Sequence, residues 1–228
     1  MFSILAIVTL AAAPFSADDV VVLSYYDRPP YMVSQPDGGA TGLTADPAVP
    51  LFERACIPYR WQMTPAKRQL SQVKEGTGHD CGIGWFKTAE RARFAEFIGP
   101  LYHDRPAVIL AGPGFPFDPA RPVEQTLAEV KTLVLVKDGL TYGSYVTKLI
   151  SRAQLNTSLV TVEQAQMVNM VVAGRAEADL LSARWLIPAE TIRIIELTGD
   201  PTGDDRYLMC SRKMNPRILE ALKDAQGE

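Results

Sequence analysis

Few side chains in this sequence are arranged for covalent or metal chemistry. Ser71 and Lys74 match the Ser-x-x-Lys motif of penicillin-recognising enzymes, but the companion Ser-Asp-Asn motif is absent. The sequence has two histidines, His79 and His103, and contains no Gly-x-Ser-x-Gly, Cys-x-x-Cys or glycine-rich phosphate motif. From these motifs we predict no catalytic function and no metal ion or other cofactor.

Thr88 and Arg91, which stand in the order Thr-x-x-Arg, have the chemistry of an anion site. A guanidinium group can bind a carboxylate through two parallel hydrogen bonds. Thr88 can cap the short helix that carries Arg91, and the free amides at the start of a helix also favour an anion. The alternative is that Arg91 is a solvated surface charge or the partner of a nearby carboxylate.

Length and composition leave room for one sizeable core or two small ones, since 47% of the 228 residues are hydrophobic. A net charge of -3 offers no basic face for nucleic acid. The apolar stretch 2–13 is shorter than the roughly 20 residues that span a bilayer, but it has the length of a secretory signal core. We predict a signal peptide at 1–17, with the cleavage site open, and therefore a protein exported to the periplasm.

The elements that must position Arg91 alternate between strands and helices. Buried strands are expected at 20–25, 59–63 and 80–85, and the helices between them start at Asp46 and cover 65–74. This alternation predicts a parallel sheet with helices on its faces.

A second alternation follows the Gly- and Pro-rich stretch 112–116. An apolar extended stretch is expected before it, at 107–111. The strands predicted after it are 132–136, 158–160, 178–181 and 193–195, and the predicted helices are 123–130, 141–153 and 161–173. The late strand 207–211 and the closing helix 216–225 are too little for a third unit and must dock onto an existing lobe. The predicted domains are lobe 1 from 18–106 with 204–228, and lobe 2 from 107–203, joined by two chain segments that form a hinge.

Three cysteines, Cys56, Cys81 and Cys210, allow one disulfide in an exported protein. The helix between the first two strands runs antiparallel to them, so its end at Cys56 and the start of the third strand at Cys81 share one edge of the sheet. We therefore predict a Cys56–Cys81 bridge and a buried free thiol at Cys210. A Cys56–Cys210 bridge is the open alternative.

Taken in order, several segments resemble the type 2 periplasmic solute-binding proteins, specifically the family that serves polar amino acid transporters (bacterial extracellular solute-binding protein family 3). The resemblance covers about residues 20–222. Its carriers are DRPPY (27–31), TGLTAD (41–46), DCGIG (80–84), KTAERARF (87–94), FIGPLY (97–102), VKDGLT (136–141) and AGRAEA (173–178). The Thr-x-x-Arg segment ahead of Phe-x-x-Pro-x-Tyr is its most specific part.

The resemblance implies an α/β fold of two lobes around a cleft, each lobe a mostly parallel sheet flanked by helices, which closes on its ligand like a Venus flytrap. It implies that Arg91 pairs with the ligand's carboxylate and that Thr141 contributes from the second lobe. Ser182 stands where an acidic residue often holds the ligand's ammonium group. Either the ligand has no ammonium, or Asp179 or Asp205 takes that role.

This sequence departs from the family in the wall of the expected site. Gly84, Trp85 and Phe86 replace a stretch that is usually rich in hydroxyls, and the two rings can either line the cleft or pack in a core. Arg28 stands where an aromatic platform is common, and Tyr25 or Tyr26 can substitute for that platform. The predicted ligand-binding residues are Arg91, Thr141, Trp85, Tyr26, Arg28, Gly84, Phe86, Thr88 and Ser182.

The resemblance implies a monomeric binding protein that captures an amino acid-like or other carboxylate ligand and delivers it to the membrane permease of an ABC transporter. Two arginines, a missing acid and added aromatic rings favour an anion with a flat or apolar part. One alternative is a periplasmic dehydratase of the cyclohexadienyl type, with Glu177, Asp179 or Asp205 as its general acid. The other is an accessory or sensor binding subunit.

Overall fold

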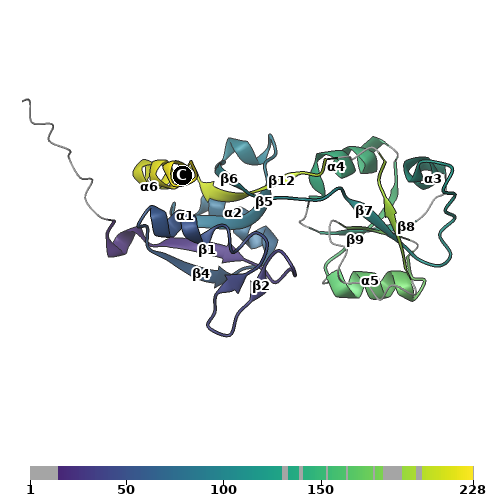
Figure 1. The fold of residues 1–228 in the computed structure, drawn as a ribbon, viewed down its shortest axis with the longest axis horizontal. Coiled ribbons are helices and arrows are strands. Elements are labelled where there is room, and N and C mark those ends of the chain that lie inside the picture. Colours follow the sequence, from purple (N-terminus) through teal and green to yellow (C-terminus); the bar gives the residue numbers. More distant parts are fainter. Residues whose placement is uncertain are drawn as a thin grey trace, which may run out of the picture.

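The computed structural model of the chain describes residues 15–129, 133–138, 141–152, 154–162, 164–176, 178–181, 192–198 and 202–227. These residues form two lobes side by side along the long axis of the molecule (Figure 1). Each lobe is built on a five-stranded sheet within the described part of the chain, which confirms the predicted two-lobed α/β class. The predicted signal peptide lies outside the described residues except for its last three positions.

The first lobe contains a mixed sheet in the order β4-β1-β5-β12-β6. Its strands are β1 (Val21–Tyr25), β4 (Tyr59–Met63), β5 (Asp80–Phe86), β6 (Ala95–His103) and β12 (Asp205–Ser211). Strands β4, β1 and β5 are parallel, whereas β12 runs antiparallel to both β5 and β6. All residues of β1 and β5 are buried, as expected for strands covered on both faces.

Helices α1 (Val49–Arg54), α2 (Ala66–Glu75) and α6 (Pro216–Asp224) belong to the first lobe, together with the short strands β2 (Val33–Ser34) and β3 (Ala40–Thr41). A 3-10 turn, η1 (Ala17–Asp19), precedes β1. Helix α6 is capped by Asn215, whose side chain accepts a hydrogen bond from the Arg217 amide. It buries Ile218, Leu219 and Leu222 in the core.

The second lobe contains a mixed sheet in the order β11-β7-β10-β8-β9. Its strands are β7 (Val108–Ala111), β8 (Leu133–Lys137), β9 (Asn156–Val160), β10 (Ala178–Leu181) and β11 (Arg193–Glu196), and its helices are α3 (Val123–Glu129), α4 (Gly143–Arg152) and α5 (Gln164–Val172). Strands β10, β8 and β9 are parallel, and β7 pairs antiparallel with β10 and β11. Both sheets therefore contain more antiparallel pairing than the sequence pattern indicated.

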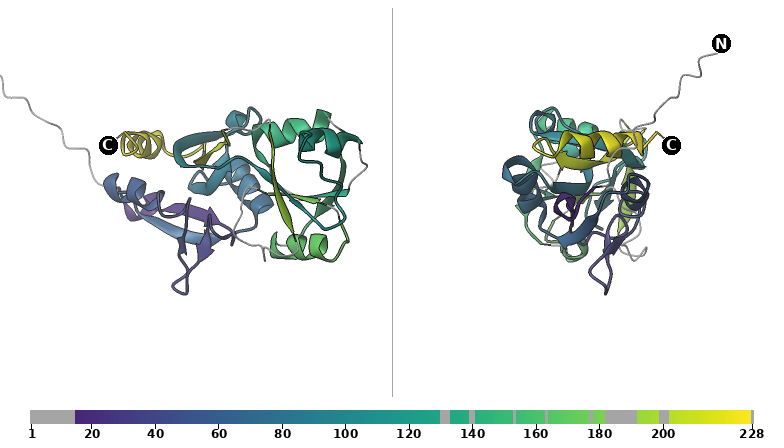
Figure 2. Two further views of the ribbon diagram at one scale, coloured as in Figure 1. Left: turned by 45° about the vertical axis from the view of Figure 1, so that its right-hand side comes forward. Right: turned by 90° about the vertical axis from the view of Figure 1, so that its left-hand side faces the viewer.

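Two chain segments pass between the lobes, one from β6 to β7 and one from β11 to β12 (Figures 1 and 2). They touch where the Asp104 amide donates to the Asp204 carbonyl oxygen at 2.9 Å. Gly203 has a φ of 71°, and a Cβ there would lie 2.0 Å from the Asp104 carbonyl oxygen. The close approach of the two segments therefore requires glycine at this position.

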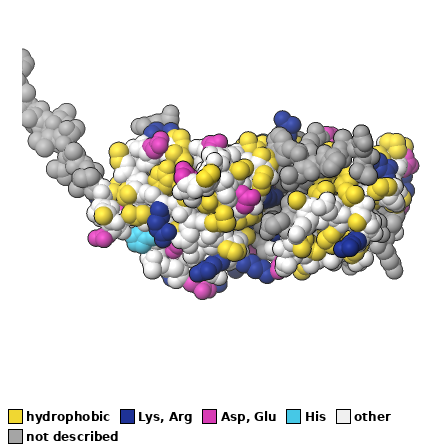
Figure 3. All heavy atoms as spheres, turned by 90° about the horizontal axis from the view of Figure 1, so that it is seen from below, with side chains coloured by type: hydrophobic (Ala, Val, Ile, Leu, Met, Phe, Trp, Pro, Cys, Tyr) yellow, Lys and Arg dark blue, Asp and Glu magenta, His cyan; other side chains and the backbone are white. Residues whose placement is uncertain are grey.

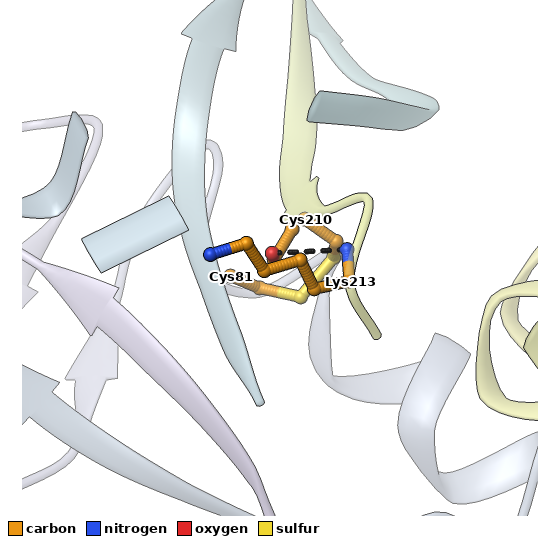
Figure 4. The surroundings of a disulfide bond; sticks show 4 residues. Cys81, Cys210 and Lys213 are labelled. Carbon is orange, nitrogen blue, oxygen red and sulfur yellow. Dashed lines mark hydrogen bonds between the residues drawn. A yellow bond between two sulfur atoms is a disulfide. The ribbon is translucent and has the colours of Figure 1, made fainter. Parts of the chain in front are cut away.

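The predicted Cys56–Cys81 disulfide is wrong, because the bridge joins Cys81 to Cys210 (Figure 4). Strand β12 lies antiparallel beside β5, with Cys210 directly opposite Cys81 and their Cα atoms 4.1 Å apart. Cys56 follows α1 in a left-handed conformation, with φ 53°, and its thiol is free and exposed. Cys210 is therefore not the free thiol that the sequence pattern predicted.

Two further expectations differ in detail. Helix α1 begins at Val49 after an uncapped Ala48, and the Asp46 carboxylate instead accepts a hydrogen bond from the Gly42 amide. Strand β6 was not predicted, because Gly99 and Pro100 interrupt its pattern. Among the described residues, no helix is long and apolar enough to cross a bilayer.

Candidate functional site

Strand β5 positions the candidate site because it ends at the junction of the lobes and leads into a short 3-10 turn, η2 (Arg91–Arg93). The Thr88 hydroxyl accepts a hydrogen bond from the Arg91 amide at 3.2 Å. This bond stabilises the turn as the sequence predicted, although Glu90, and not Thr88, immediately precedes the 3-10 helix. Gly84 has a φ of 74°, and a Cβ there would lie 3.0 Å from the Thr44 hydroxyl, so glycine suits this bend in the strand.

Arg91 lies in the interface between the lobes with 6% of its surface exposed. Its Nη1 donates to the Phe86 carbonyl oxygen at 3.0 Å and to the Thr141 hydroxyl, in the second lobe, at 3.2 Å. Its guanidinium group stands 4.6 Å from the centre of the Trp85 ring. Among the described residues no carboxylate forms an ion pair with Arg91.

Arg91 is therefore not a solvated surface charge, and within the described part of the chain it is not half of an ion pair. Burial lowers its pKa, because removing water disfavours the charged form, and nearby Glu90 only partly offsets this effect. A cation that is desolvated without a counter-charge can gain free energy when an anion reaches it.

Residues of both lobes enclose a narrow cavity around Arg91. Its lining consists of Tyr26, Arg28, Ile83, Gly84, Trp85, Phe86, Arg91, Thr141 and Arg206. The structure thus places seven of the nine predicted site residues on one cavity, and Thr88 in the adjoining turn. Ser182 lies outside the described residues. The cavity measures about 10 Å³, which is room for no more than about one water molecule, so a ligand must separate the lobes or displace Thr141 from Arg91.

Trp85 is packed into the core of the first lobe and offers the narrow cavity only part of its ring. Its Nε1 donates to the Gln69 side chain at 2.9 Å, and Gln69 in turn donates to the Thr64 carbonyl oxygen at 2.8 Å. A Cβ at Gly82 would lie 2.5 Å from the indole nitrogen, so glycine there makes room for the ring. The fixed indole therefore supports the Arg91 guanidinium from one side.

Arg206 and Asp104 form a buried ion pair that sequence reasoning did not identify. The Arg206 Nε lies 2.8 and 2.9 Å from the two carboxylate oxygens of Asp104, and its Nη2 lies 2.7 Å from Oδ2. Its Nη1 donates to the Gly84 carbonyl oxygen at 2.9 Å. The guanidinium lies 4.3 Å from the ring centres of both Tyr31 and Phe86.

This ion pair links the two segments that connect the lobes. Asp104 follows β6 at the first crossing, and Arg206 lies in β12 directly after the second. Neither residue stands in a motif, and no local pattern in the sequence associates them.

A third arginine, Arg28, reaches the narrow cavity from the loop after β1. Its Nη1 donates to the Tyr26 hydroxyl at 3.4 Å, and its guanidinium lies 5.1 Å from the centre of the Tyr31 ring. Tyr26 is partly buried and also lines a larger cavity nearby. Tyr25, the other predicted platform residue, points elsewhere, because its hydroxyl donates to the carbonyl oxygens of Gly38 and Gly39.

The larger cavity has a volume of about 500 Å³ and is also lined by both lobes. Its residues are Tyr26, Asp27, Met63, Pro65, Ala66, Lys67, Lys137, Asp138 and Thr161. This volume falls in the range typical of small-molecule sites. An ion pair between Lys67 of α2 and Asp138 crosses from the first lobe to the second at this cavity. The Lys67 side chain is 66% exposed, so this pair alone adds little to stability.

Figure 3 shows several separate groups of basic side chains on one face of the molecule, and one of these groups lies at the junction of the lobes.

At the hinge, His103 contacts the Asp205 carboxylate at 2.7 Å and the Thr202 carbonyl oxygen. The bond to Asp205 and then that to Thr202 raise the pKa of His103. Among the described residues, no cluster of three or more His, Cys, Asp and Glu could hold a metal ion.

The fold is similar to that of solved amino acid-binding proteins. An ancestral arginine-binding protein bound to arginine matches with a TM-score of 0.72 and 18% identity, covering 92% of this chain and 91% of that one. The holo arginine-binding protein from T. maritima matches with a TM-score of 0.70 and 18% identity over 92% and 90% of the two chains.

Another similar structure is the ancestral amino acid-binding protein AncCDT-1, described as a precursor of cyclohexadienyl dehydratase. It has a TM-score of 0.69 and 19% identity, with 92% of this chain and 88% of that chain covered. No protein-family profile and no curated protein matches the sequence. At these identities the similarity establishes the fold, and function must be argued from the site.

Proposed function

We propose that this chain is a solute-binding protein of the polar amino acid transporter family, which captures a small carboxylate-bearing ligand between its lobes. The observation that carries the proposal is the buried Arg91, which lacks a carboxylate partner among the described residues and bonds across the interface to Thr141. Each lobe contributes to the lining, so ligand contacts would favour the closed arrangement. The ligand carboxylate takes the place of the Thr141 hydroxyl at one guanidinium nitrogen and bonds a second.

The biological setting follows from the same proposal. The N-terminal signal directs the chain to the periplasm, where the oxidising environment maintains the disulfide. The loaded protein passes its ligand, as a monomer, to the permease of an ABC transporter. Two similar structures support this role by their descriptions: one is the substrate-binding protein of an amino acid ABC transporter, and the other concerns glutathione import through GshT and the cystine ABC importer TcyBC of Streptococcus mutans.

A binding role is favoured over the dehydratase because no carboxyl group lines the narrow cavity among the described residues. Asp205, one of the candidate acids, instead bonds His103 and lines neither cavity. The side chains of Glu177 and Asp179 lie outside what the structure describes. Incubation with prephenate or arogenate distinguishes the two functions, because a dehydratase releases water and carbon dioxide from prephenate and a binding protein does not.

Calorimetric titration tests the binding proposal directly. The purified chain is titrated with a panel of zwitterionic amino acids, aliphatic carboxylates and aromatic carboxylates, and at least one carboxylate is expected to bind. Arg91→Ala should then weaken that binding severely. The matched control is Arg93→Ala, which removes an exposed arginine of the same turn and should leave the affinity unchanged. Equal affinities for the two variants would contradict the assignment of Arg91.

A further inference from the structure

Three guanidinium groups line the narrow cavity, and only one of them has a carboxylate partner among the described residues. Arg206 is neutralised by Asp104, which engages its Nε and Nη2. Of the described residues, Arg91 donates to a carbonyl oxygen and a hydroxyl. Within the same described part of the chain, Arg28 donates to the Tyr26 hydroxyl and faces the Tyr31 ring.

The acidic residues nearby do not compensate these two cations. No Asp or Glu lines the narrow cavity among the described residues. In the larger cavity, Asp138 pairs with Lys67, and Asp27 accepts hydrogen bonds from the Ser34 amide and hydroxyl at 2.8 and 3.0 Å. Asp104 acts on Arg28 only at longer range and is already occupied. Among the described residues, Arg28 and Arg91 therefore bring to one small site two guanidinium groups that have no ion-paired carboxylate.

Two like charges in a site that excludes water repel each other, and this repulsion grows as the local dielectric constant falls. A single carboxylate at Arg91 would leave the charge of Arg28 unmatched when the lobes close. A ligand with two carboxylates would neutralise both guanidinium groups through charge-assisted hydrogen bonds. The Tyr26 ring belongs to both cavities, so a chain that leaves the narrow cavity would pass beside it.

We infer that the ligand is a small dicarboxylate, with one carboxylate held by Arg91 and the other by Arg28. This inference rests on the proposed binding function and narrows its ligand class. Arg28 is then the residue that determines specificity for the second charge, whereas Arg91 determines whether any carboxylate binds. By resemblance, the family commonly has an aromatic platform where this sequence has Arg28, and the structure brings that cation to the narrow cavity.

The experiment compares dicarboxylates with their own monoamides, which keep the shape of the molecule and remove one charge. Malonate, succinate, glutarate and adipate are each titrated beside the corresponding monoamide. The best dicarboxylate should bind about ten- to a hundredfold more tightly than its monoamide, the range for one charged hydrogen-bonded contact. Arg28→Gln should abolish this preference, because it should weaken binding of the dicarboxylate about ten- to a hundredfold more than binding of the monoamide.

Two further variants keep the outcome interpretable. Arg28→Lys retains the charge and should retain most of the preference, and Arg93→Gln should retain all of it. Equal affinity of wild type for a dicarboxylate and its monoamide would overturn the inference, as would equal weakening of both by Arg28→Gln. Binding of monocarboxylates or zwitterionic amino acids without any dicarboxylate would overturn it and leave the proposed function intact. If no compound of the whole panel binds, both proposals are wrong.

Discussion

Replacing Asp104 by Asn tests the buried ion pair at the hinge. Asparagine keeps the size of the side chain and removes its charge, so Arg206 stays between two aromatic rings without a counter-ion. The two side chains are 2% and 3% exposed, which leaves water unable to compensate. Removing one partner of a buried ion pair typically destabilises a protein by about 3–5 kcal/mol. That is a large fraction of the roughly 5–15 kcal/mol by which domains are stable, and we expect the free energy of unfolding to fall accordingly.

Urea denaturation followed by tryptophan fluorescence and circular dichroism measures this loss. The control is Glu96→Gln, which removes surface ion pairs with Arg212 and Lys223 and should change the free energy of unfolding by less than about 1 kcal/mol. A double variant, Asp104→Leu with Arg206→Met, should recover much of the loss, because apolar side chains can fill a buried site that an unpaired charge cannot. If Asp104→Asn proves as mild as Glu96→Gln, the reasoning that the buried pair stabilises the hinge is refuted.

Three other outcomes follow from the structure. Arg91→Ala should reduce carboxylate affinity about 30- to several-thousand-fold, and Arg91→Lys should restore it only partly, because an ammonium group cannot make the planar two-pronged contact. Calorimetric titration measures the affinities, and an alanine variant that binds nearly as tightly as wild type would contradict the assigned site. An aromatic disulfide reagent should react with one thiol per native chain, that of Cys56, and two or more reactive native thiols would exclude the Cys81–Cys210 pairing. Cys81→Ala should lower the free energy of unfolding, measured in urea, by about 2–5 kcal/mol, because the bridge to Cys210 closes a long loop. Because the pKa of His103 is raised in the fold, its contacts stabilise the fold fully below the unfolded pKa of about 6.5 and lose that effect as pH rises through the folded pKa. His103→Gln should therefore lower the melting temperature more at pH 5 than at pH 9. An equal effect at both pH values would rule out a charge-dependent contact.

Local patterning was sufficient to predict most of the individual elements. The strand predicted at 59–63 is β4, and the helix predicted at 65–74 is α2, which begins and ends within one residue of that range. Such elements depend on the spacing of apolar side chains within a few residues, which the sequence displays directly. Strand β6 was not predicted because Gly99 and Pro100 break the local pattern. Its pairing with the distant β12 stabilises the strand where the local sequence preference does not.

The site residues also fall into those that the local sequence predicted and those whose contacts depend on the tertiary structure. Arg91 and Thr88 could be found in the sequence, because both their spacing and their turn are local. The contact between Arg91 and Thr141 depends on how the lobes meet, which no short segment encodes. That Arg28 forms no ion pair with a carboxylate among the described residues also emerges only from the tertiary structure, because its neighbours come from distant segments.

By itself, the sequence determined the alternation of strands and helices, the two-lobed class and the segment that carries Arg91. Only the tertiary structure decided which distant partners meet. The insertion of β12 between β5 and β6 places Cys210 opposite Cys81, 129 residues away, and Arg206 against Asp104, 102 residues away. The physical reason is that local preference does not select which strands a late strand pairs with. The pairing of β12 with β5 and β6 is favoured because it buries β12, brings Cys210 to Cys81 and neutralises Arg206 with Asp104.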